Sequence, residues 1–402
     1  MKFKRSLFVI SLVVATIFIL SPTSYAGIPA GFDDKEIRIG LVGPLTGPAA
    51  PWGGVVRGAA LLFKVVNEEG GIHGRKIKFF LRDDQYNPAQ TKAVVKELVE
   101  RKGVFAFTCG TGNAQCMAVT DYLLENKVLM VGQAASIKKY LFPPNPYFFG
   151  VYPLYDDDAS IVTKYVVEKL GYKKIGFFYQ NDAYGKEGLA GCKRRLATYG
   201  IKLVAEIPVE PTEKDLASQM LRFKNSGAEA ILMWVNPTVA VISLKTCASM
   251  QYKPQWVSSY TLQDHSFMYK ISGGLWEGVI TGAYLPPPDS NLPLVVKYRE
   301  AAKRFNPELP LEQRWNQFII GGIMFAEPLV EALKIAGRDL STKACIKALN
   351  SIKDFQGIGP KVSFSKKCHQ GTDSFQITRC GPGGTFELLQ DWTSNDLATW
   401  KK

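Results

Sequence analysis

The residue types that most often carry out chemistry are sparse in this chain and do not cluster. Its three histidines, His73, His265 and His369, lie far apart in the sequence, and none has a patterned partner. Its seven cysteines form no CxxC pair and no Cys/His group with the spacing of a zinc site. No GxSxG, HExxH, Walker or EF-hand motif occurs. We therefore expect no enzymatic activity and no bound metal or cofactor.

Two local patterns come nearer to a chemical site. Gly110-Thr111-Gly112 follows a predicted strand, as the glycines of a dinucleotide fingerprint do, but Gln115 stands where the third glycine belongs. A phosphate site there remains an alternative. The acidic runs Asp83-Asp84 and Asp156–Asp158 lie at the end of a predicted strand and at the start of a predicted helix, which favours structural roles over acid–base work.

The cysteines leave two interpretations open. Export would permit disulfides, and the nearest pairs in sequence are Cys109 with Cys116 and Cys368 with Cys380. An odd number of cysteines leaves at least one outside an intramolecular bridge. The alternative is that several are small buried apolar residues.

The first residues are typical of a secretory signal peptide. Lys2, Lys4 and Arg5 precede an uncharged apolar run from Leu7 to Leu20, and small residues then allow a cut after Ala26. A membrane span needs about 20 apolar residues, and this run is shorter. We expect a soluble mature protein in the periplasm that does not itself span the membrane.

The chain is basic, with a formal net charge of +13. Three of the positive charges belong to the predicted signal peptide. Export argues against nucleic acid as a partner, and basic residues elsewhere are mixed with acidic ones. We interpret the excess as a solvated surface with a positive bias.

The chain of 402 residues is long enough for two domains. From Glu36 onward, predicted strands and helices alternate, which favours parallel sheets with helices on both faces. The units suffice for two sheets of about five strands each. After residue 284 the pattern becomes mostly helical, with helices expected at 293–305, 315–336 (interrupted at Pro328) and 341–352, and short strands near Val362 and Phe386.

Several segments resemble periplasmic leucine/isoleucine/valine-binding proteins. The resemblance runs in order from Glu36 to about Phe364 and includes "IRIGLVGPLTGPAAPWGG" and "FFYQNDAYGKEG". Its other parts are 67–91, 224–234 and 331–337. It implies a type I periplasmic binding protein, which has two Rossmann-like doubly wound lobes joined by three hinge crossings. Lobe one would comprise 27–153 and 284–355, and lobe two 154–283 and 356–402.

The resemblance also implies a ligand site between the lobes. Trp52 matches an aromatic residue that packs on the ligand side chain. The loops Cys109-Gly110-Thr111 and Ala135-Ser136 match those that bind the ligand carboxylate. Other residues implied by the alignment are Tyr184, Asn236 and its neighbours to Thr238, and Tyr260 with Thr261. The family function is capture of a small molecule and its delivery to an ABC transporter permease in the inner membrane.

One departure bears on the ligand. Tyr155 stands where amino-acid binders carry an aspartate that pairs with the ligand ammonium, and a buried cation without a counter-charge is costly. Asp156 or Asp264 is a possible substitute. Otherwise the ligand is an aromatic or aliphatic acid without an amino group. A ligand-sensing subunit for a membrane receptor or kinase is the alternative function on the same scaffold.

Overall fold

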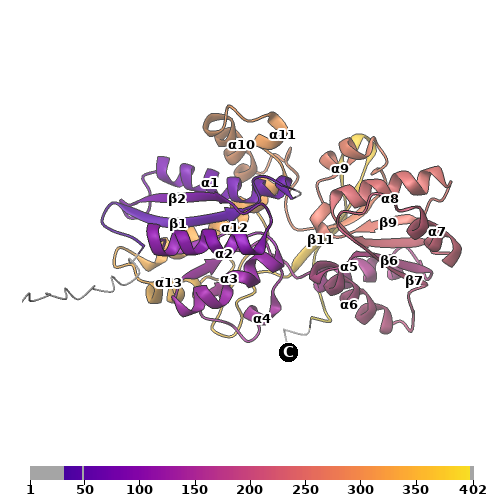
Figure 1. Ribbon diagram of the computed structural model, residues 1–402, viewed down its shortest axis with the longest axis horizontal. Helices are drawn as coiled ribbons and strands as arrows, with labels where there is room; N and C mark the ends of the chain where they lie inside the picture. The colour runs from indigo at the N-terminus through magenta and orange to yellow at the C-terminus, as the bar shows by residue number, and fades with distance from the viewer. Residues whose placement is uncertain (1–30, 48, 399–402) are drawn as a thin grey trace, which may run out of the picture.

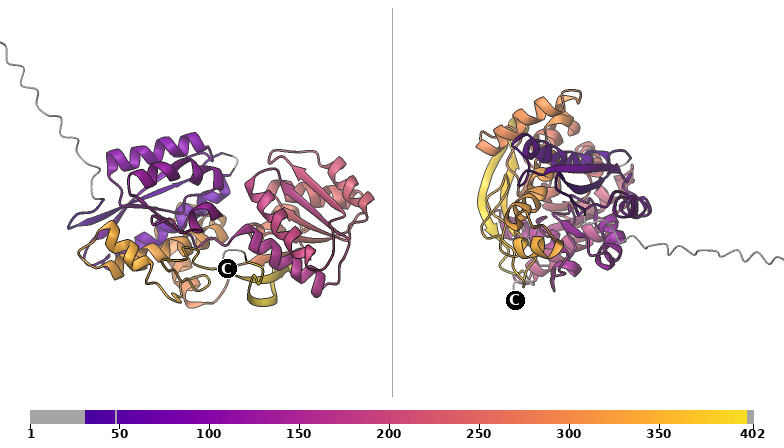
Figure 2. Two further views of the ribbon diagram at one scale, coloured as in Figure 1. Left: turned by 90° about the horizontal axis from the view of Figure 1, so that it is seen from below. Right: turned by 90° about the vertical axis from the view of Figure 1, so that its left-hand side faces the viewer.

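The molecule consists of two α/β lobes that lie side by side (Figures 1 and 2). The structure, a computed structural model, describes residues 31–47 and 49–398. The predicted signal peptide and its cleavage site after Ala26 lie outside these residues. Within them, no helix is both long enough and apolar enough to cross a membrane.

The first lobe is built on a five-stranded parallel sheet with the order β2-β1-β3-β4-β5. Its strands are mostly short runs of buried residues, as expected for a sheet covered on both faces. They are β1 (Glu36–Gly43), β2 (Lys76–Asp83), β3 (Ala106–Thr108), β4 (Leu129–Val131) and β5 (Phe148–Phe149). The helices between them are α1 (Gly53–Glu68), α2 (Pro88–Glu97), α3 (Asn113–Glu125) and α4 (Lys138–Leu141).

The second lobe is built on a seven-stranded sheet with the order β12-β11-β10-β9-β8-β6-β7. Its strands are β6 (Ile175–Gln180), β7 (Ala205–Val209), β8 (Ala230–Trp234), β9 (Gln255–Ser258), β10 (Ile280–Ala283), β11 (Ser374–Cys380) and β12 (Phe386–Ser394). Its helices are α5 (Tyr155–Glu168), α6 (Ala183–Ala197), α7 (Ala217–Ser226), α8 (Pro237–Ser249) and α9 (His265–Ser272). The last two strands pair antiparallel, and β11 had no counterpart in the sequence prediction.

The chain passes between the lobes three times, which confirms the predicted fold class. It leaves the first lobe after β5 and returns after β10, and it crosses again before β11. The returning segment forms α10 (Pro293–Phe305), α11 (Leu311–Arg314), α12 (Gln317–Ala336) and α13 (Thr342–Leu349). Helices α10 and α12 pack on α1. Helix α12 continues through Pro328, where an interruption was expected.

The segment 356–371 differs from its expected place in lobe two. His369 Nδ1 lies 2.9 Å from the Phe148 carbonyl oxygen, and Gln370 forms a parallel bridge with Gly150. Val362, expected in a strand, forms only an isolated bridge with Phe355. The segment stays with the first lobe because its apolar side chains, among them Phe364, which meets the Phe149 ring edge-on, are buried there.

Six of the seven cysteines are buried and unbridged, which favours the interpretation as small apolar residues. They are Cys109, Cys116, Cys192, Cys247, Cys345 and Cys380. Among the described residues, no group of three or more His, Cys, Asp or Glu side chains is arranged to hold a metal ion.

Candidate functional site

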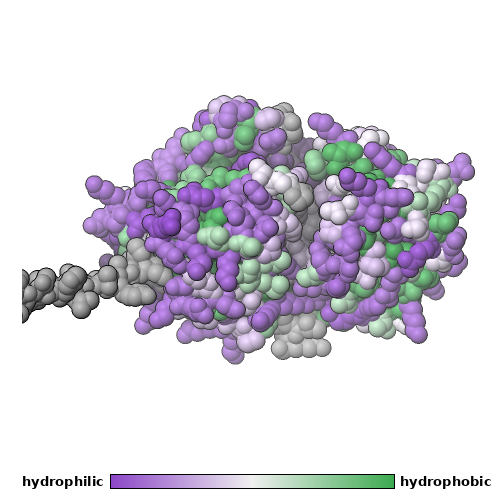
Figure 3. All heavy atoms as spheres, viewed as in Figure 1, coloured by the Kyte–Doolittle hydropathy of each residue, from purple (hydrophilic) through white to green (hydrophobic). Residues whose placement is uncertain are grey.

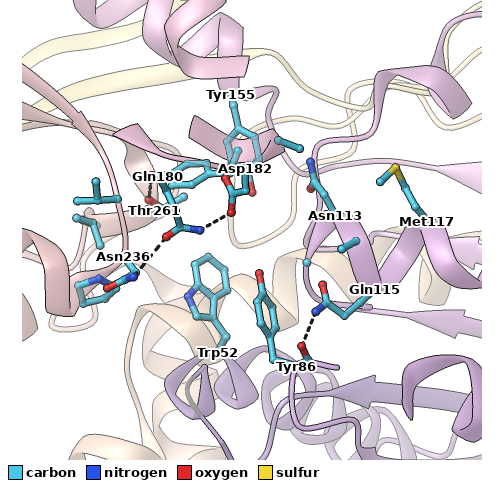
Figure 4. Close-up of a pocket in the computed structure, with 17 residues that line it drawn as sticks. Trp52, Tyr86, Asn113, Gln115, Met117, Tyr155, Gln180, Asp182, Asn236 and Thr261 are labelled. Carbon is cyan, nitrogen blue, oxygen red and sulfur yellow. Dashed lines mark hydrogen bonds between the residues drawn. The ribbon is translucent and has the colours of Figure 1, made fainter. Parts of the chain in front are cut away.

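A cavity of roughly 840 Å³, open to solvent, lies between the two lobes. The surface of the molecule is hollowed at this position (Figure 3), and Figure 4 shows the side chains around the cavity. Both lobes contribute to its walls: Trp52, Tyr86, Gly112, Asn113, Ala114, Gln115 and Met117 come from the first, and Tyr155, Gln180, Asp182, Ala183, Tyr184, Val235, Asn236, Pro237, Thr261 and Leu262 from the second.

The N-terminus of α3 opens onto the cavity from the first lobe. Gly112 precedes the helix, and no side chain caps it. The first backbone hydrogen bond of the helix runs from Cys116 N to Gly112 O at 3.0 Å. The N–H groups of the residues before Cys116 therefore have no partner within the helix. Such groups attract anions because they are unpaired within the helix and lie at its positive end.

Gln115 lies behind this helix start and is only 3% exposed. Its Nε2 donates to the Tyr86 carbonyl oxygen at 2.7 Å, whereas its Oε1 has no hydrogen-bond partner in the described part of the chain. Gly112 has φ of +95°, and a Cβ there would lie 2.3 Å from Gln115 Oε1. A side chain at position 112 would therefore have to displace this amide, and the positive φ favours glycine.

Two aromatic rings form the floor of the cavity in Figure 4. Trp52 follows the glycine-rich turn after β1 and packs on Phe318, with ring centroids 5.0 Å apart. Tyr86 follows β2 with φ of +59°, and 39% of it is exposed. Both rings point into the cavity, where they present rigid apolar faces.

Two further helix starts face the cavity from the second lobe, and each is capped by the side chain of the residue just before the helix. Asp182 Oδ1 accepts from Gly185 N at 3.1 Å at the start of α6, and Asp182 Oδ2 accepts from Gln180 Nε2. Asn236 Oδ1 accepts from Val239 N at 3.0 Å at the start of α8. These caps satisfy the helix ends with protein atoms.

The second lobe also supplies aromatic rings. Tyr155 and Tyr184 meet edge to face, with centroids 4.7 Å apart. The Tyr184 hydroxyl lies 2.7 Å from Thr261 Oγ1. Burial, with the negative charge of Asp182 adding to it, raises the pKa of Tyr86 to about 12. The phenols of the site therefore stay neutral at physiological pH.

Among the described residues, the cavity is lined by a single charged side chain, which is negative. Asp182 is its only carboxylate, and no lysine, arginine or histidine lines it among residues 31–47 and 49–398. A ligand anion would have to be held by N–H groups and hydroxyls rather than by a cationic side chain.

Four of the residues implied by the sequence, together with Thr261, lie along the cavity. They are Trp52, Tyr155, Tyr184 and Asn236. Cys109, Gly110 and Thr111 lie just before the cavity wall at Gly112. The Cys109 thiol donates to the Gly322 carbonyl oxygen at 3.3 Å, and the Thr111 hydroxyl donates to the Cys109 carbonyl oxygen at 3.1 Å.

The other implied residues are bonded within the protein. Tyr260 is buried, and its hydroxyl donates to the Pro153 carbonyl oxygen at 2.6 Å. Ala135 is buried too. The Ser136 hydroxyl donates to Glu187 Oε2 of α6 at 3.0 Å.

Neither substitute aspartate lines the cavity. Asp156 is buried in ion pairs with Lys138 and with Arg194, the latter at 2.8 Å. Asp264 caps α9 through Phe267 N at 3.0 Å and accepts from Gln317 N at 3.3 Å. Both carboxylates serve structural partners.

Sequence reasoning did not select eleven of the residues that line the cavity, among them Tyr86, Gln115, Met117, Gln180 and Asp182. A usable signal existed for two of them. Gln180 ends β6 and Asp182 follows it, and ligands of doubly wound sheets bind beyond the carboxyl ends of the strands. Asp182 both caps α6 and borders the cavity.

Residues 36–385 match the family model of the periplasmic binding proteins. The chain belongs to this family. Relatives include the Leu/Ile/Val-binding protein homolog 1 of Brucella suis biovar 1, 25% identical over 83% of this chain and 87% of that protein. The Leu/Ile/Val-binding protein homolog 3 of Brucella melitensis biotype 1 is 31% identical over 49% of this chain and 53% of that protein.

The matched part of the chain thus spans about half the length of the second of these periplasmic binding proteins. Among solved structures, a branched-chain amino acid ABC transporter protein from Thermus thermophilus with bound valine has a TM-score of 0.82, at 18% identity, and covers 91% of this chain and 98% of that one. A fatty acid ABC transporter substrate-binding protein from Thermomonospora curvata has a TM-score of 0.80, at 24% identity over 92% and 95%. Identities this low show the fold alone. The resemblance predicted from the sequence is confirmed.

Proposed function

We propose that this protein is an exported, non-catalytic solute-binding protein that captures a small carboxylate-bearing molecule in the interlobe cavity. It then hands the molecule to the permease of an ABC importer in the inner membrane. The observation that carries the proposal is the uncapped start of α3 at a cavity shared by both lobes.

The α3 start supplies what a carboxylate needs in a site without a cation. The first N–H groups of α3 act as donors, and the positive end of the helix favours the negative charge. Hydrogen bonds to a charged group contribute about 1.5–3 kcal/mol each. The Asn113 side chain is held nearby by Ser136, since Ser136 N donates to Asn113 Oδ1 at 3.0 Å.

Closure of the lobes converts binding into a signal for the permease. A ligand that touches both walls binds the closed form better and shifts the population toward it. Binding with a Kd of about 1 μM has a free energy of about −8 kcal/mol, which exceeds a closure cost of a few kcal/mol. Family membership and the N-terminal signal sequence support a periplasmic location.

A thermal unfolding screen over amino acids, aromatic acids and aliphatic acids tests the proposal. A ligand at about 100 times its Kd stabilises the folded state by about 2.7 kcal/mol. Small-angle scattering of the protein with each stabilising ligand should show a more compact particle than the protein without ligand. Unchanged unfolding and scattering with every solute, or turnover of any solute, would contradict the proposal.

A further inference from the structure

The side-chain carbonyl of Gln115 is a buried acceptor that lacks a donor. The Tyr86 carbonyl oxygen accepts from Gln115 Nε2 at 2.7 Å, so the amide nitrogen must face Tyr86 and Oε1 must face the other way. This Oε1 has no hydrogen-bond partner within the described part of the chain, although only 3% of the residue is exposed. A buried acceptor without a donor costs folding free energy, and a ligand N–H or O–H group at the cavity wall would remove that cost.

Asp182 faces the same cavity from the other lobe, where no cationic side chain pairs with it in the described part of the chain. Its oxygens accept from the neutral donors Gly185 N–H and Gln180 Nε2. It forms no ion pair among the residues that the structure describes, and no cationic side chain borders the cavity there. A purely anionic ligand would bring a second negative charge into this space, which like-charge repulsion disfavours.

The aromatic rings give the site a further preference. Trp52 and Tyr86 approach from the first lobe and Tyr155 from the second (Figure 4), and Tyr184 of the second lobe also lines the cavity. Aromatic side chains pack well against a ring placed between them, and their faces also attract cations.

We infer that the ligand is a zwitterionic amino acid with an aromatic side chain, whose ammonium group lies between the Asp182 carboxylate and Gln115 Oε1. The carboxylate of the ligand then meets the start of α3, and its ring lies among the four aromatic residues. Asp182 replaces, from a different position, the counter-charge that Tyr155 cannot provide. This inference rests on the proposed function and specifies its substrate class.

Calorimetry on the full exported chain distinguishes the parts of the inference. The probes are phenylalanine, tyrosine and tryptophan, with leucine, phenylacetate and 2-phenylethylamine as comparisons. At least one aromatic amino acid should bind at least tenfold more tightly than the three comparison compounds. Tighter binding of leucine, or equal binding of phenylacetate, overturns the inference and leaves the proposed function intact. Absence of binding by every carboxylate in the set overturns the inference, whereas the proposed function fails only if the wider thermal unfolding screen also finds no ligand.

The Asp182→Asn variant tests the ammonium contact directly. Asparagine is as good a helix cap as aspartate, so α6 should remain intact. The substitution should weaken binding of the aromatic amino acid at least tenfold and should not weaken binding of phenylacetate. Equal weakening of both, or no weakening, overturns the role of Asp182.

Asp215→Asn is the matched control. Asp215 Oδ1 accepts from Ala217 N at 3.0 Å near the start of α7 in the same lobe, away from the cavity. The control removes the same charge and should leave both affinities within twofold of the unsubstituted protein. A loss as large as that of Asp182→Asn would assign the effect to the overall charge of the lobe and would overturn the inference.

Discussion

The Ser136 hydroxyl of the first lobe donates a hydrogen bond to the Glu187 carboxylate of the second lobe, with 3.0 Å between Oγ and Oε2. The Tyr155 N–H donates to the same Ser136 oxygen at 3.4 Å. Ser136 was expected to bind the carboxylate of a ligand. In this structure a carboxylate of the protein itself takes that place, and the contact joins the two lobes beside the cavity.

The Glu187 contact predicts a pH dependence of stability. Burial raises the pKa of Glu187 to about 7 from its ordinary 4.5, and Asp156 and Asp182 also raise it, whereas Ser136 and Lys138 lower it. Between these two values the folded state keeps a proton that the unfolded chain has lost. Stability from this group is therefore present below pH 4.5 and is lost as the pH rises through 7.

Glu187→Gln should flatten that slope by up to about 1.4 kcal/mol per pH unit, as measured by urea unfolding between pH 4.5 and 7. Asp158 and Glu327, whose pKa values burial raises to about 8 and about 7, remain in both proteins, so the difference reports Glu187. Glu300→Gln is the control, because Lys303 lowers the pKa of Glu300. An identical slope in the Glu187 variant would contradict the assignment.

Gly112→Ala should weaken ligand binding at least tenfold. The added Cβ would lie 2.3 Å from Gln115 Oε1 and 2.8 Å from Tyr86 Cε2, and φ of +95° is unfavourable for alanine. Both the amide and the ring would shift away from their positions at the cavity. Calorimetry with the best ligand of the screen measures the effect.

Gly171→Ala separates backbone strain from the clash. Gly171 has φ of +76°, but no atom lies within 4 Å of the position of its Cβ. The control should lose about 1 kcal/mol of stability and should keep its affinity. Unchanged affinity in Gly112→Ala would show that the start of α3 does not contact the ligand.

Tyr260→Phe should affect stability rather than ligand affinity. The substitution removes the hydroxyl that donates to the Pro153 carbonyl oxygen at 2.6 Å and leaves a buried acceptor unpaired, at a cost of about 1–3 kcal/mol. Tyr184→Phe, which removes a hydroxyl at the cavity wall, should change affinity instead. If Tyr260→Phe lost much affinity and kept its stability, the Tyr260 hydroxyl would have to contact the ligand.

The buried thiols should resist alkylation in the folded protein. Burial raises the pKa of Cys109, Cys192 and Cys345 to about 12, so the reactive thiolate is rare at neutral pH. Iodoacetamide labelling followed by mass spectrometry should modify these residues only after unfolding in guanidinium. Labelling of Cys109 in the native state would contradict the described packing.

The amino-acid sequence by itself determined the fold class. The period of apolar residues and the capping residues act locally, so they predicted the observed bounds of α10, 293–305. Sequence reasoning missed β11, whose antiparallel pairing with β10 joins residues about a hundred positions apart. A local signal existed, because buried Phe375 and Ile377 alternate with half-buried Ser374 and Gln376 as in a strand with one covered face.

Only the tertiary structure decided which residues border the cavity. The loop 109–111 and Ser136 have the residue types of a carboxylate site, yet their polar atoms bond within the protein, and the uncapped start of α3 at Gly112 opens to the cavity instead. The reason is physical: a site between two lobes depends on how the sheets are set against each other. Contacts such as that between Ser136 and Glu187 fix this arrangement, and no local pattern encodes them.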